Sequence, residues 1–327
     1  MATLNIAVIG AGRIGQIHAR NVAAHPALRL AGIADPDREA AERLAQATAS
    51  TVMALDDAFR ADALLICSPT TTHADYIERA AAAGKPVFCE KPVDLSAGRV
   101  RVCLETVRRS GIPLMIGFNR RFDRHFGALK QRLDAGEIGT LELLTIMSRD
   151  PAPPPVGYIA TSGGLFRDMM IHDLDVARYF LGDEPVEVFA AASALIDPAI
   201  GAAGDVDTAV ATLKTASGRL CQISNSRRAT YGYDQRIELH GSKGLLRAGN
   251  VTPTMVEYAD GAGFRTDPAL PFFLERYGDA YRAELDAFVI AVRTGGAPKP
   301  DGEDGLRALI LADAATESAR TGQAVRV

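Results

Sequence analysis

The run from Gly163 to Asp175 holds the side chains whose types and spacing most clearly suggest chemistry. Asp168 and His172 stand four residues apart, a spacing that puts two side chains on one face of a helix. A carboxylate beside an imidazole is a common way to make a general base that works near neutral pH. Asp175 follows three residues after His172, on the same expected surface. Acidic residues and a histidine also decorate ordinary solvated helices, so the run alone leaves both interpretations open.

The composition bounds the class of protein that carries this run. The chain has 327 residues, which makes two domains the default expectation. Its hydrophobic content of 47% and charged content of 23% are typical of a globular protein. A net charge of −4 gives no argument for binding nucleic acid or an anionic membrane. With no apolar stretch of roughly 20 residues and no signal-peptide pattern, we expect a cytoplasmic protein without a membrane partner.

Cysteines and pairs of arginines are two further residue classes that could form sites. The four cysteines lack Cys-x-x-Cys pairing, and free buried thiols in a reducing compartment are therefore expected. These cysteines are Cys67, Cys89, Cys103 and Cys221. The basic pairs Arg120-Arg121 and Arg227-Arg228 are possible anion contacts, although most such pairs lie on solvated surface.

A glycine-rich turn near the N-terminus predicts a dinucleotide site. The apolar run Leu4–Ile9 leads directly into Gly10-Ala-Gly12-Arg-Ile-Gly15, and a helical pattern follows. In such a strand–turn–helix unit, Gly10 permits the tight turn, Gly12 admits a pyrophosphate and Gly15 lets the helix pack on the strand. The phosphate then lies against the N–H groups that begin the helix.

An acidic residue after the second apolar run predicts which dinucleotide binds. Asp35 follows the run Leu28–Ala34 and stands twenty residues after Gly15. A carboxylate at this place accepts hydrogen bonds from the adenosine ribose and repels a 2′-phosphate. The sequence therefore predicts NAD rather than NADP, and the alternative is an incidental glycine turn beside a surface aspartate.

The elements that must position these residues alternate as far as residue 118. We expect helices over 37–47, 70–83 and 96–109, with strands over 62–67, 86–89 and 113–118. This alternation predicts an α/β Rossmann domain, a doubly wound parallel sheet, over residues 1–118. Ligands bind beyond the carboxyl ends of such strands. The residues just past those ends are Ser68-Pro69-Thr70 with His73, Glu90-Lys91-Pro92 and Asn119-Arg120-Arg121.

Lys91 differs from the solvated lysines that are the rule in proteins. It follows a strand on the cofactor side of the expected sheet and precedes a proline that restricts the local backbone. A cationic side chain there can hold a substrate hydroxyl beside the nicotinamide and lower the pKa of that hydroxyl.

The pattern changes after residue 118, and we expect an α+β domain over residues 119–327. A helix over 122–135 and a strand over 141–149 precede the proline-rich segment 150–155, which forms either a stiff connection or a wall over a pocket. Consecutive strand-like runs between residues 186 and 258 predict a large, mainly antiparallel open sheet. Two helices, over 273–294 and 303–321, close the chain.

Several motifs, taken in order, resemble the glucose–fructose oxidoreductase/inositol dehydrogenase family. They are Gly10–Gly15, Asp35, Glu90-Lys91-Pro92 and the run with Asp168 and His172, and the resemblance covers essentially the whole chain. Within that family the chain looks most like the NAD-dependent inositol 2-dehydrogenases. The pointers are the runs Gly117–Asp123, Ser148–Pro155 and Ser162–Asp173.

The resemblance implies that Lys91, Asp168 and His172 form the catalytic group. His172 would take the proton from a hydroxyl as hydride leaves its carbon for the nicotinamide. Asp168 would orient and charge-stabilise the imidazole, and Lys91 would hydrogen-bond the reacting oxygen. A polyol pocket needs carboxylates and amides as acceptors with a few charged donors. The implied polyol contacts are Lys91, Arg121, Asp150, Asp168, His172 and Asp175, with Tyr233 and Gln235 as less certain candidates.

The expected cofactor site gathers residues from the turns after the first four strands. It comprises Gly10, Gly12, Arg13, Ile14, Gly15, Asp35, Ser68, Thr70, His73, Glu90 and Lys91.

The leading interpretation is NAD-dependent oxidation of a cyclitol hydroxyl to a ketone, with myo-inositol giving 2-keto-myo-inositol (scyllo-inosose). Another inositol isomer or a pyranose sugar keeps the same chemistry. A non-catalytic dinucleotide-binding regulatory protein would not need Lys91, Asp168 and His172. A metal enzyme would rest on the thin ligand set of one histidine with acids on one helix, so no metal is predicted. The resemblance also implies self-association through the C-terminal sheet, as a dimer or tetramer.

Overall fold

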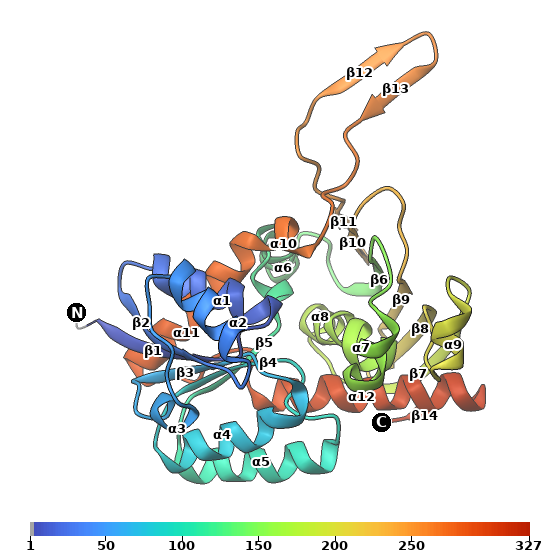
Figure 1. Ribbon diagram of the computed structural model, residues 1–327. Coiled ribbons are helices and arrows are strands. Elements are labelled where there is room, and N and C mark those ends of the chain that lie inside the picture. The colour runs from blue at the N-terminus through green and yellow to red at the C-terminus, as the bar shows by residue number, and fades with distance from the viewer. Residues whose placement is uncertain (1–2) are drawn as a thin grey trace. The chain divides into compact units, whose positions relative to one another are not determined.

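The computed structural model of the protein describes residues 3–327. The chain divides into two compact units (Figure 1). The first holds the residues up to Asn119 together with Asp279–Leu309, and the second holds Arg120–Gly278 with Ile310–Val327. The division expected after residue 118 lies one residue from this boundary. The sequence did not indicate that Asp279–Leu309 returns to the first unit, where Asp301 pairs with Met115.

The first unit is built on a five-stranded sheet in the order β2-β1-β3-β4-β5, with every neighbouring pair parallel. The strands are β1 (Leu4–Ile9), β2 (Leu28–Ala34), β3 (Ala63–Ile66), β4 (Val87–Glu90) and β5 (Leu114–Gly117). The chain reverses its direction of travel across the sheet at β1 and β3, the place where such sheets bind nucleotides. The predicted doubly wound sheet is confirmed.

Helices cover both faces of this sheet, which explains why β3, β4 and β5 are wholly buried and, apart from Glu90 at the end of β4, consist of hydrophobic residues and glycine. Helices α4 and α5 lie side by side on one face (Figure 1). Helix α11 covers β4, where the rings of Phe288 and Phe88 meet at 5.9 Å. The helices of this unit are α1 (Arg13–Ala24), α2 (Arg38–Ala47), α3 (Leu55–Ala58), α4 (His73–Ala82), α5 (Ala97–Ser110) and α11 (Gly278–Thr294).

The second unit contains a seven-stranded sheet in the order β11-β10-β6-β9-β8-β7-β14. Only β6 and β9 pair in parallel among its neighbours, so the expected mainly antiparallel sheet is confirmed. Burial alternates along β8, because one face of the sheet is covered and the other is open. The strands are β6 (Leu141–Arg149), β7 (Pro185–Ser193), β8 (Thr208–Thr215), β9 (Leu220–Ser226), β10 (Asp234–Gly241), β11 (Gly244–Ala248) and β14 (Val325–Arg326).

The helices of the second unit include one that crosses the covered face of the sheet, α8, which contacts β6. They are α6 (Arg124–Asp134), α7 (Val156–Ser162), α8 (Ile171–Leu181), α9 (Pro198–Ala202), α10 (Phe273–Arg276) and α12 (Gly302–Thr321), which begins in the first unit. Two strands, β12 (Glu257–Asp260) and β13 (Gly263–Thr266), form a separate hairpin that projects from this unit (Figure 1). No helix within residues 3–327 is both long and apolar enough to cross a membrane.

The segment around Asp168 differs from the single helix that its spacing predicts. Residues Phe166–Met170 form a short π-helical turn, and α8 starts only at Ile171. The preceding α7 was not expected, and it ends where Gly163 and Gly164 take φ angles of +84° and +80°. Only glycine adopts that left-handed region without strain. A π-turn inside a helix is often found at a functional site.

Candidate active site

The glycine turn after β1 has the shape that a dinucleotide requires. A Cβ atom on Gly10 would lie 2.5 Å from the backbone of Cys67, and one on Gly15 would lie 2.0 Å from the carbonyl oxygen of Gly10. These two glycines are therefore needed for close packing of the turn and α1. A Cβ on Gly12 would meet no heavy atom within 4 Å, because that edge of the turn faces open space. Arg13 and Ile14 begin α1 beside it.

Asp35 completes this site from the end of β2. One carboxylate oxygen accepts a hydrogen bond from the backbone N–H of Ala11 at 2.6 Å, and the other accepts one from Asp37 at 2.8 Å. The acid is thus held directly against the glycine turn. A turn with open space at Gly12 and a fixed carboxylate beside it fits the pyrophosphate and the ribose of NAD.

His73 has a role that its place in the sequence did not reveal. The ring is buried, and its two nitrogens contact the carbonyl oxygens of Ser68 and Pro92, each at 2.7 Å. The side chain therefore ties the loop after β3 to the loop after β4. Burial lowers the pKa of His73, although the carbonyl contacts oppose that shift. The cofactor contacts expected of Ser68, Thr70 and His73 stay predictions.

The Glu90-Lys91-Pro92 run leaves the carboxyl end of β4, as expected. Lys91 is half-buried and is joined to Pro92 by a cis peptide bond. The Glu90 carboxylate is directed into the first unit, where it contacts Nε2 of His18 at 2.7 Å. Lys91 belongs to the first unit, whereas Asp168 and His172 belong to the second.

Asp168 lies in the π-turn, where Tyr158 and Arg227 contact its carboxylate. The hydroxyl of Tyr158, on α7, donates to one carboxylate oxygen at 3.1 Å. The guanidinium of Arg227 lies 3.8 Å from the other. His172 is half-buried in the first turn of α8. Asp168 is therefore a fixed carboxylate four positions before the His172 imidazole, and a carboxylate together with an imidazole can act as a general base.

Arg227 has a role that the sequence left open. The pair Arg227-Arg228 is a possible anion contact by sequence, and the structure buries the Arg227 side chain between Asp168 and Asp205, with the Asp205 carboxylate 3.6 Å away. Its backbone N–H donates to the carbonyl of Asp207 at 2.8 Å. The only signal in the sequence is its place just after a strand of the second sheet.

Asp150 is the carboxyl group of this region with the most altered acidity. Burial raises its pKa to about 6, the nearby charge of Asp168 adds to the shift, and Arg227 and Arg120 oppose it. Its backbone N–H donates to Ser226, which anchors the start of the proline-rich segment on β9. A carboxyl group with this pKa changes its charge within the range in which a histidine does.

The basic pair Arg120-Arg121 is not a solvated surface. Arg120 forms an ion pair with Asp173, and Arg121 makes a two-pronged contact with Asp175 at 2.8 and 2.6 Å. All four side chains are largely buried. Burial raises the pKa of Asp173, and Arg120 and a hydrogen bond from Asn225 oppose that shift. The polyol contacts expected of Arg121 and Asp175 stay predictions. The structure places the two residues against each other, and it also places Arg121 over the Tyr179 ring and Asp175 3.9 Å from Arg178.

Tyr233 and Gln235 lie inside the second unit. The Tyr233 ring packs edge-on against Phe272 and Tyr277, and burial raises the pKa of its hydroxyl well above the ordinary value. The Gln235 side-chain oxygen accepts hydrogen bonds from Ser148 at 2.9 Å and from Tyr277 at 3.1 Å. Both residues are nearly inaccessible to solvent, so their expected contact with a polyol remains a prediction.

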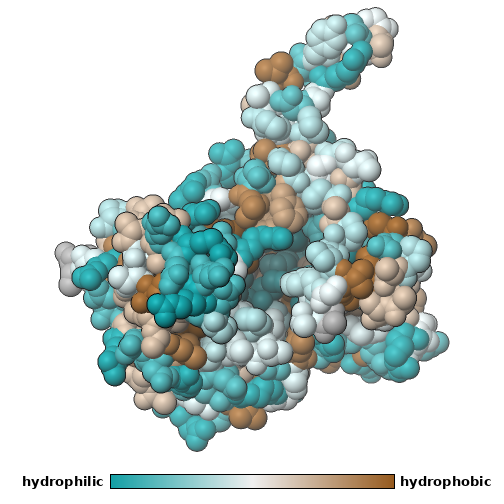
Figure 2. Space-filling model, viewed as in Figure 1, coloured by the Kyte–Doolittle hydropathy of each residue, from teal (hydrophilic) through white to brown (hydrophobic). Residues whose placement is uncertain are grey.

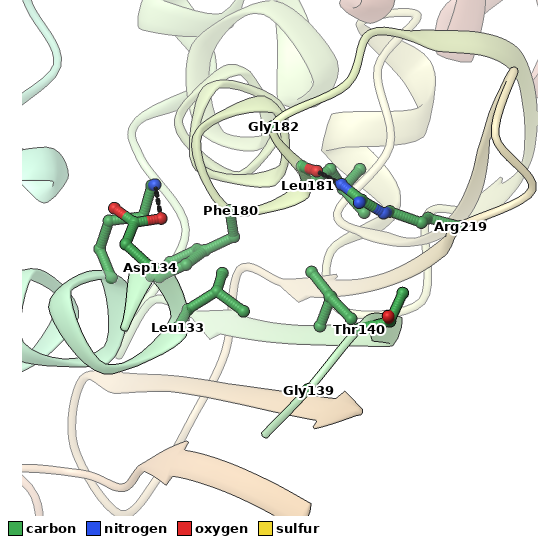
Figure 3. Close-up of a pocket in the computed structure, with 10 residues that line it drawn as sticks. Leu133, Asp134, Gly139, Thr140, Phe180, Leu181, Gly182 and Arg219 are labelled. Atoms are coloured by element: carbon green, nitrogen blue, oxygen red, sulfur yellow. Dashed lines mark hydrogen bonds and ion pairs between the residues drawn. The ribbon is translucent and has the colours of Figure 1, made fainter. Parts of the chain in front are cut away.

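A pocket elsewhere on the second unit contains none of the predicted site residues. It has a volume of about 310 Å³ and lies among α6, the turn before β6 and the end of α8 (Figure 3). Arg219 reaches across it and donates to the carbonyl of Leu181. Lys130 at its edge pairs with Asp134. With both cations engaged, nothing connects this pocket to the chemistry around Asp168.

Comparison with known proteins agrees with the motifs in both units. Residues 4–118 match an oxidoreductase family described by its NAD-binding Rossmann fold, and residues 130–327 match the C-terminal alpha/beta domain of the same family. An inositol 2-dehydrogenase of Rhizobium meliloti is 53% identical over 319 residues, 97% of each chain.

Solved structures of inositol dehydrogenases have the same fold as this chain over almost its whole length. A myo-inositol dehydrogenase from Corynebacterium glutamicum has a TM-score of 0.95 at 48% identity, over 99% of each chain. A scyllo-inositol dehydrogenase from Lactobacillus casei, solved with NAD(H) and scyllo-inositol bound, has a TM-score of 0.92 at 31% identity, again over 99% of each chain. The resemblance inferred from the motifs and the expected cofactor are confirmed. The chain therefore belongs to this family of NAD-dependent oxidoreductases, which the motifs identified as the glucose–fructose oxidoreductase/inositol dehydrogenase family.

Proposed function

We propose that this protein oxidises one hydroxyl of myo-inositol to a ketone, giving 2-keto-myo-inositol (scyllo-inosose), with NAD as the oxidant. The observation that carries the proposal is the Asp168–His172 pair, whose carboxylate is held by Tyr158 and Arg227. The similarity to proteins named inositol 2-dehydrogenase and myo-inositol dehydrogenase supports the choice of substrate.

The catalytic roles follow from what each side chain can do. NAD, when bound, supplies a nicotinamide ring that accepts a hydride from the carbon being oxidised. His172 takes the hydroxyl proton at an imidazole nitrogen, and the Asp168 carboxylate stabilises the imidazolium that results. Lys91 hydrogen-bonds the reacting oxygen and favours its loss of a proton. Tyr158 and Arg227 keep Asp168 in place for this task.

The polyol would be recognised by acceptors and donors around this group. Asp150, when ionised, accepts hydrogen bonds from ring hydroxyls, and we retain Arg121, Asp175 and Tyr233 as proposed contacts. A buried group that a substrate hydroxyl must satisfy discriminates strongly against an analogue that lacks that hydroxyl.

A second candidate keeps the chemistry and changes the substrate. One structurally similar protein was solved with scyllo-inositol bound, so another inositol isomer is a specific alternative. A pyranose sugar oxidised at C1 is a further one. A non-catalytic dinucleotide-binding regulatory protein is disfavoured by the presence of Lys91, Asp168 and His172 together.

A substrate panel tests the proposal. Purified full-length protein is supplied with NAD and, in turn, with myo-inositol, scyllo-inositol, chiro-inositol and hexoses, and NADH is followed by its absorbance. We expect the highest kcat/KM with myo-inositol. NADH formation with a hexose but not with myo-inositol would show the substrate assignment to be wrong.

The base assignment needs a variant and a matched control. His172→Ala should lower kcat by roughly 10²–10⁴-fold, as loss of a general base does, while NAD binding stays near wild type. His240→Ala, at an exposed histidine of the same unit, should change neither quantity. Unchanged turnover in His172→Ala would rule out its role as the base.

We also propose that the protein works in the cytoplasm, in cyclitol catabolism. We further propose that it self-associates as a dimer or tetramer through the open face of the sheet in its second unit. That face exposes Phe189, Val210 and Leu220. The hairpin β12–β13 is exposed along its strands except at Gly263, and it carries hydrophobic as well as hydrophilic side chains (Figure 2). Light scattering after size exclusion tests this, and a monomer at all concentrations would contradict it. The four free cysteines fit a reducing compartment.

A further inference from the structure

A cluster of ionisable side chains lies in the interior of the first unit, and one of its members, Glu90, immediately precedes Lys91 in the chain. His18 of α1, Glu90 of β4 and Glu284 of α11 each direct one ligand-type atom into a space in which these atoms lie within 4.8 Å of one another. His18 and Glu284 have no exposed surface, and Glu90 has 9%. Nε2 of His18 and Oε1 of Glu90 are 2.7 Å apart, which is a hydrogen bond.

Glu284 is the residue that requires an explanation. Neither of its carboxylate oxygens accepts a hydrogen bond from any residue that the structure describes, although both are buried. A buried carboxylate without donors is costly, and two neighbouring carboxylates are rarely both ionised. Burial and the negative charge of Glu90 both raise the pKa of Glu284 well above its ordinary value. Cys67, just after β3, and Cys89, on β4, are further titratable groups that face Glu90, and burial raises the pKa of both thiols. His73 also interacts with Glu90, and burial lowers the pKa of its imidazole.

The surroundings of Glu90 show how closely its carboxylate is confined. A Cβ atom added to Gly117, on the neighbouring strand β5, would lie 3.0 Å from Cδ and 3.1 Å from both oxygens of Glu90. Glycine at this position therefore makes room for the carboxylate. On the other side, the His18 ring is fixed by Phe88 at 4.9 Å and by Tyr281 at 5.7 Å between ring centres.

We propose that Glu284 is a neutral carboxylic acid that donates its proton in a hydrogen bond to the Glu90 carboxylate, and that His18 and Glu284 are positioning residues for the Glu90-Lys91-Pro92 turn. Glu90 then receives donors from α1 and α11 and is confined by β5. One peptide bond separates it from Lys91, so this arrangement restrains the backbone that carries the proposed catalytic lysine. The role in catalysis rests on the proposed function of Lys91.

The geometry of the cluster favours a proton on Glu284 over a metal ion bound by His18, Glu90 and Glu284. Histidine and carboxylate ligands about 2.0–2.2 Å from one tetrahedral ion lie roughly 3.3 Å apart. The two atoms of His18 and Glu90 are closer than that, at 2.7 Å. One proton on Glu284 also removes the repulsion between the two carboxyl groups without requiring further ligands in a space enclosed by two helices and the sheet.

Infrared difference spectroscopy tests the protonation independently of activity. Wild-type protein at pH 8 should show the C=O band of a protonated carboxylic acid, and Glu284→Gln should lack it. Asp279→Asn removes an exposed acid on the same helix and is the control that should leave the band unchanged. Absence of the band in the wild type, or its persistence in Glu284→Gln, would overturn the neutral acid. So would one equivalent of tightly held metal in the purified protein.

Kinetics with NAD and the best substrate of the panel test the positioning role. Glu284→Met removes the donor and should lower kcat by roughly 10–100-fold, as displacement of a catalytic group does, with KM values within about threefold of wild type. Glu284→Gln keeps a donor towards Glu90 and should stay within about threefold of wild-type kcat. Gly117→Ala should also lower kcat, because it pushes against the Glu90 carboxylate.

The outcomes separate the two proposals. Unchanged kcat in Glu284→Met, or an equal loss in Glu284→Gln, would refute positioning by a hydrogen bond. If Glu284→Met does not fold, the comparison of Glu284→Gln with Gly117→Ala decides instead, and it refutes positioning if Gly117→Ala keeps wild-type kcat. A wild-type protein inactive on the whole panel would count against the proposed function, and the infrared band would still decide the state of Glu284.

Discussion

The contact between Arg121 and Asp175 gives the prediction that separates a structural role from substrate binding most sharply. The side chain of Asp175 is 0% exposed and that of Arg121 is 11% exposed. Removing one partner of a buried ion pair costs about 3–5 kcal/mol, because the other charge stays buried. Asn at position 175 keeps part of the hydrogen bonding, so we expect the lower end of this range for Asp175→Asn.

This loss has a measurable size in a thermal unfolding experiment. At about 2–4 °C per kcal/mol for a unit of 150–250 residues, a loss of about 3 kcal/mol lowers the melting temperature by roughly 6–12 °C. The matched control is Asp134→Asn, which removes the acid of an exposed pair with Lys130 and should cost less than about 1 kcal/mol. The double variant Arg121→Met/Asp175→Leu should recover part of the loss, since it removes both charges of this pair, while Arg178, 3.9 Å from Asp175, keeps its ion pair with Glu184.

Differential scanning fluorimetry on the full chain, with KM for the substrate measured alongside, decides between the two roles. A fall of less than about 2 °C in Asp175→Asn, together with an increase of about tenfold in KM, would refute the structural interpretation. The two residues would then be the polyol contacts that the motifs implied. A large fall in melting temperature with an unchanged KM would leave them as a buried support of α8.

Three further predictions concern the cofactor turn and the Asp150 carboxyl group. Gly15→Ala should prevent NAD binding, because the added Cβ would lie 2.0 Å from the Gly10 carbonyl oxygen. Gly12→Ala should fold normally and weaken only NAD binding, because the added Cβ meets no heavy atom within 4 Å. Calorimetric titration with NAD measures both effects. Asp35→Ser should narrow the preference for NAD over NADP, and equal wild-type kcat/KM with both cofactors would contradict the role of Asp35. The folded protein binds a proton on Asp150 more tightly than the unfolded chain does, because folding raises the pKa of this group from 3.8 to about 6. The protonated carboxyl group therefore contributes to the stability of the fold at low pH, and this contribution is lost as the pH rises from 3.8 to about 6. Asp150→Asn should therefore melt higher than wild type at pH 8 but not at pH 4, and equal melting temperatures at pH 8 would contradict the raised pKa.

The first unit was largely predictable because its signals are local in the chain. The tight turn at Gly10, the packing at Gly15 and the carboxylate of Asp35 all act within one strand–helix–strand unit, where neighbours in sequence are neighbours in space. The strands expected over 62–67 and 86–89 correspond to β3 and β4, which are buried along their whole length. The return of Asp279–Leu309 to this unit could not be predicted, because no local pattern records which sheet a distant helix will cover.

The site contacts of the second unit join residues that lie far apart in the sequence, and local patterns do not predict such contacts. Arg120 contacts Asp173 at a separation of 53 residues, and Arg121 contacts Asp175 at 54, so the sequence alone could not identify these buried partners. Arg227 reached Asp168 in the same way. The spacing of Asp168 and His172 indicated a shared helix face, but the π-turn at Phe166–Met170 depends on packing that a periodicity cannot describe.

By itself, the sequence determined the family, the cofactor, the two kinds of sheet and the short list of residues with chemistry, since glycine turns, strand ends and short spacings are properties of neighbouring positions. Only the tertiary structure decided which charges are buried and what faces them. Glu90 contacts His18, 72 residues away, and Glu284 joins them from the far end of the chain. The energy of a charge depends on its burial and on the charges around it, and folding alone brings those charges together.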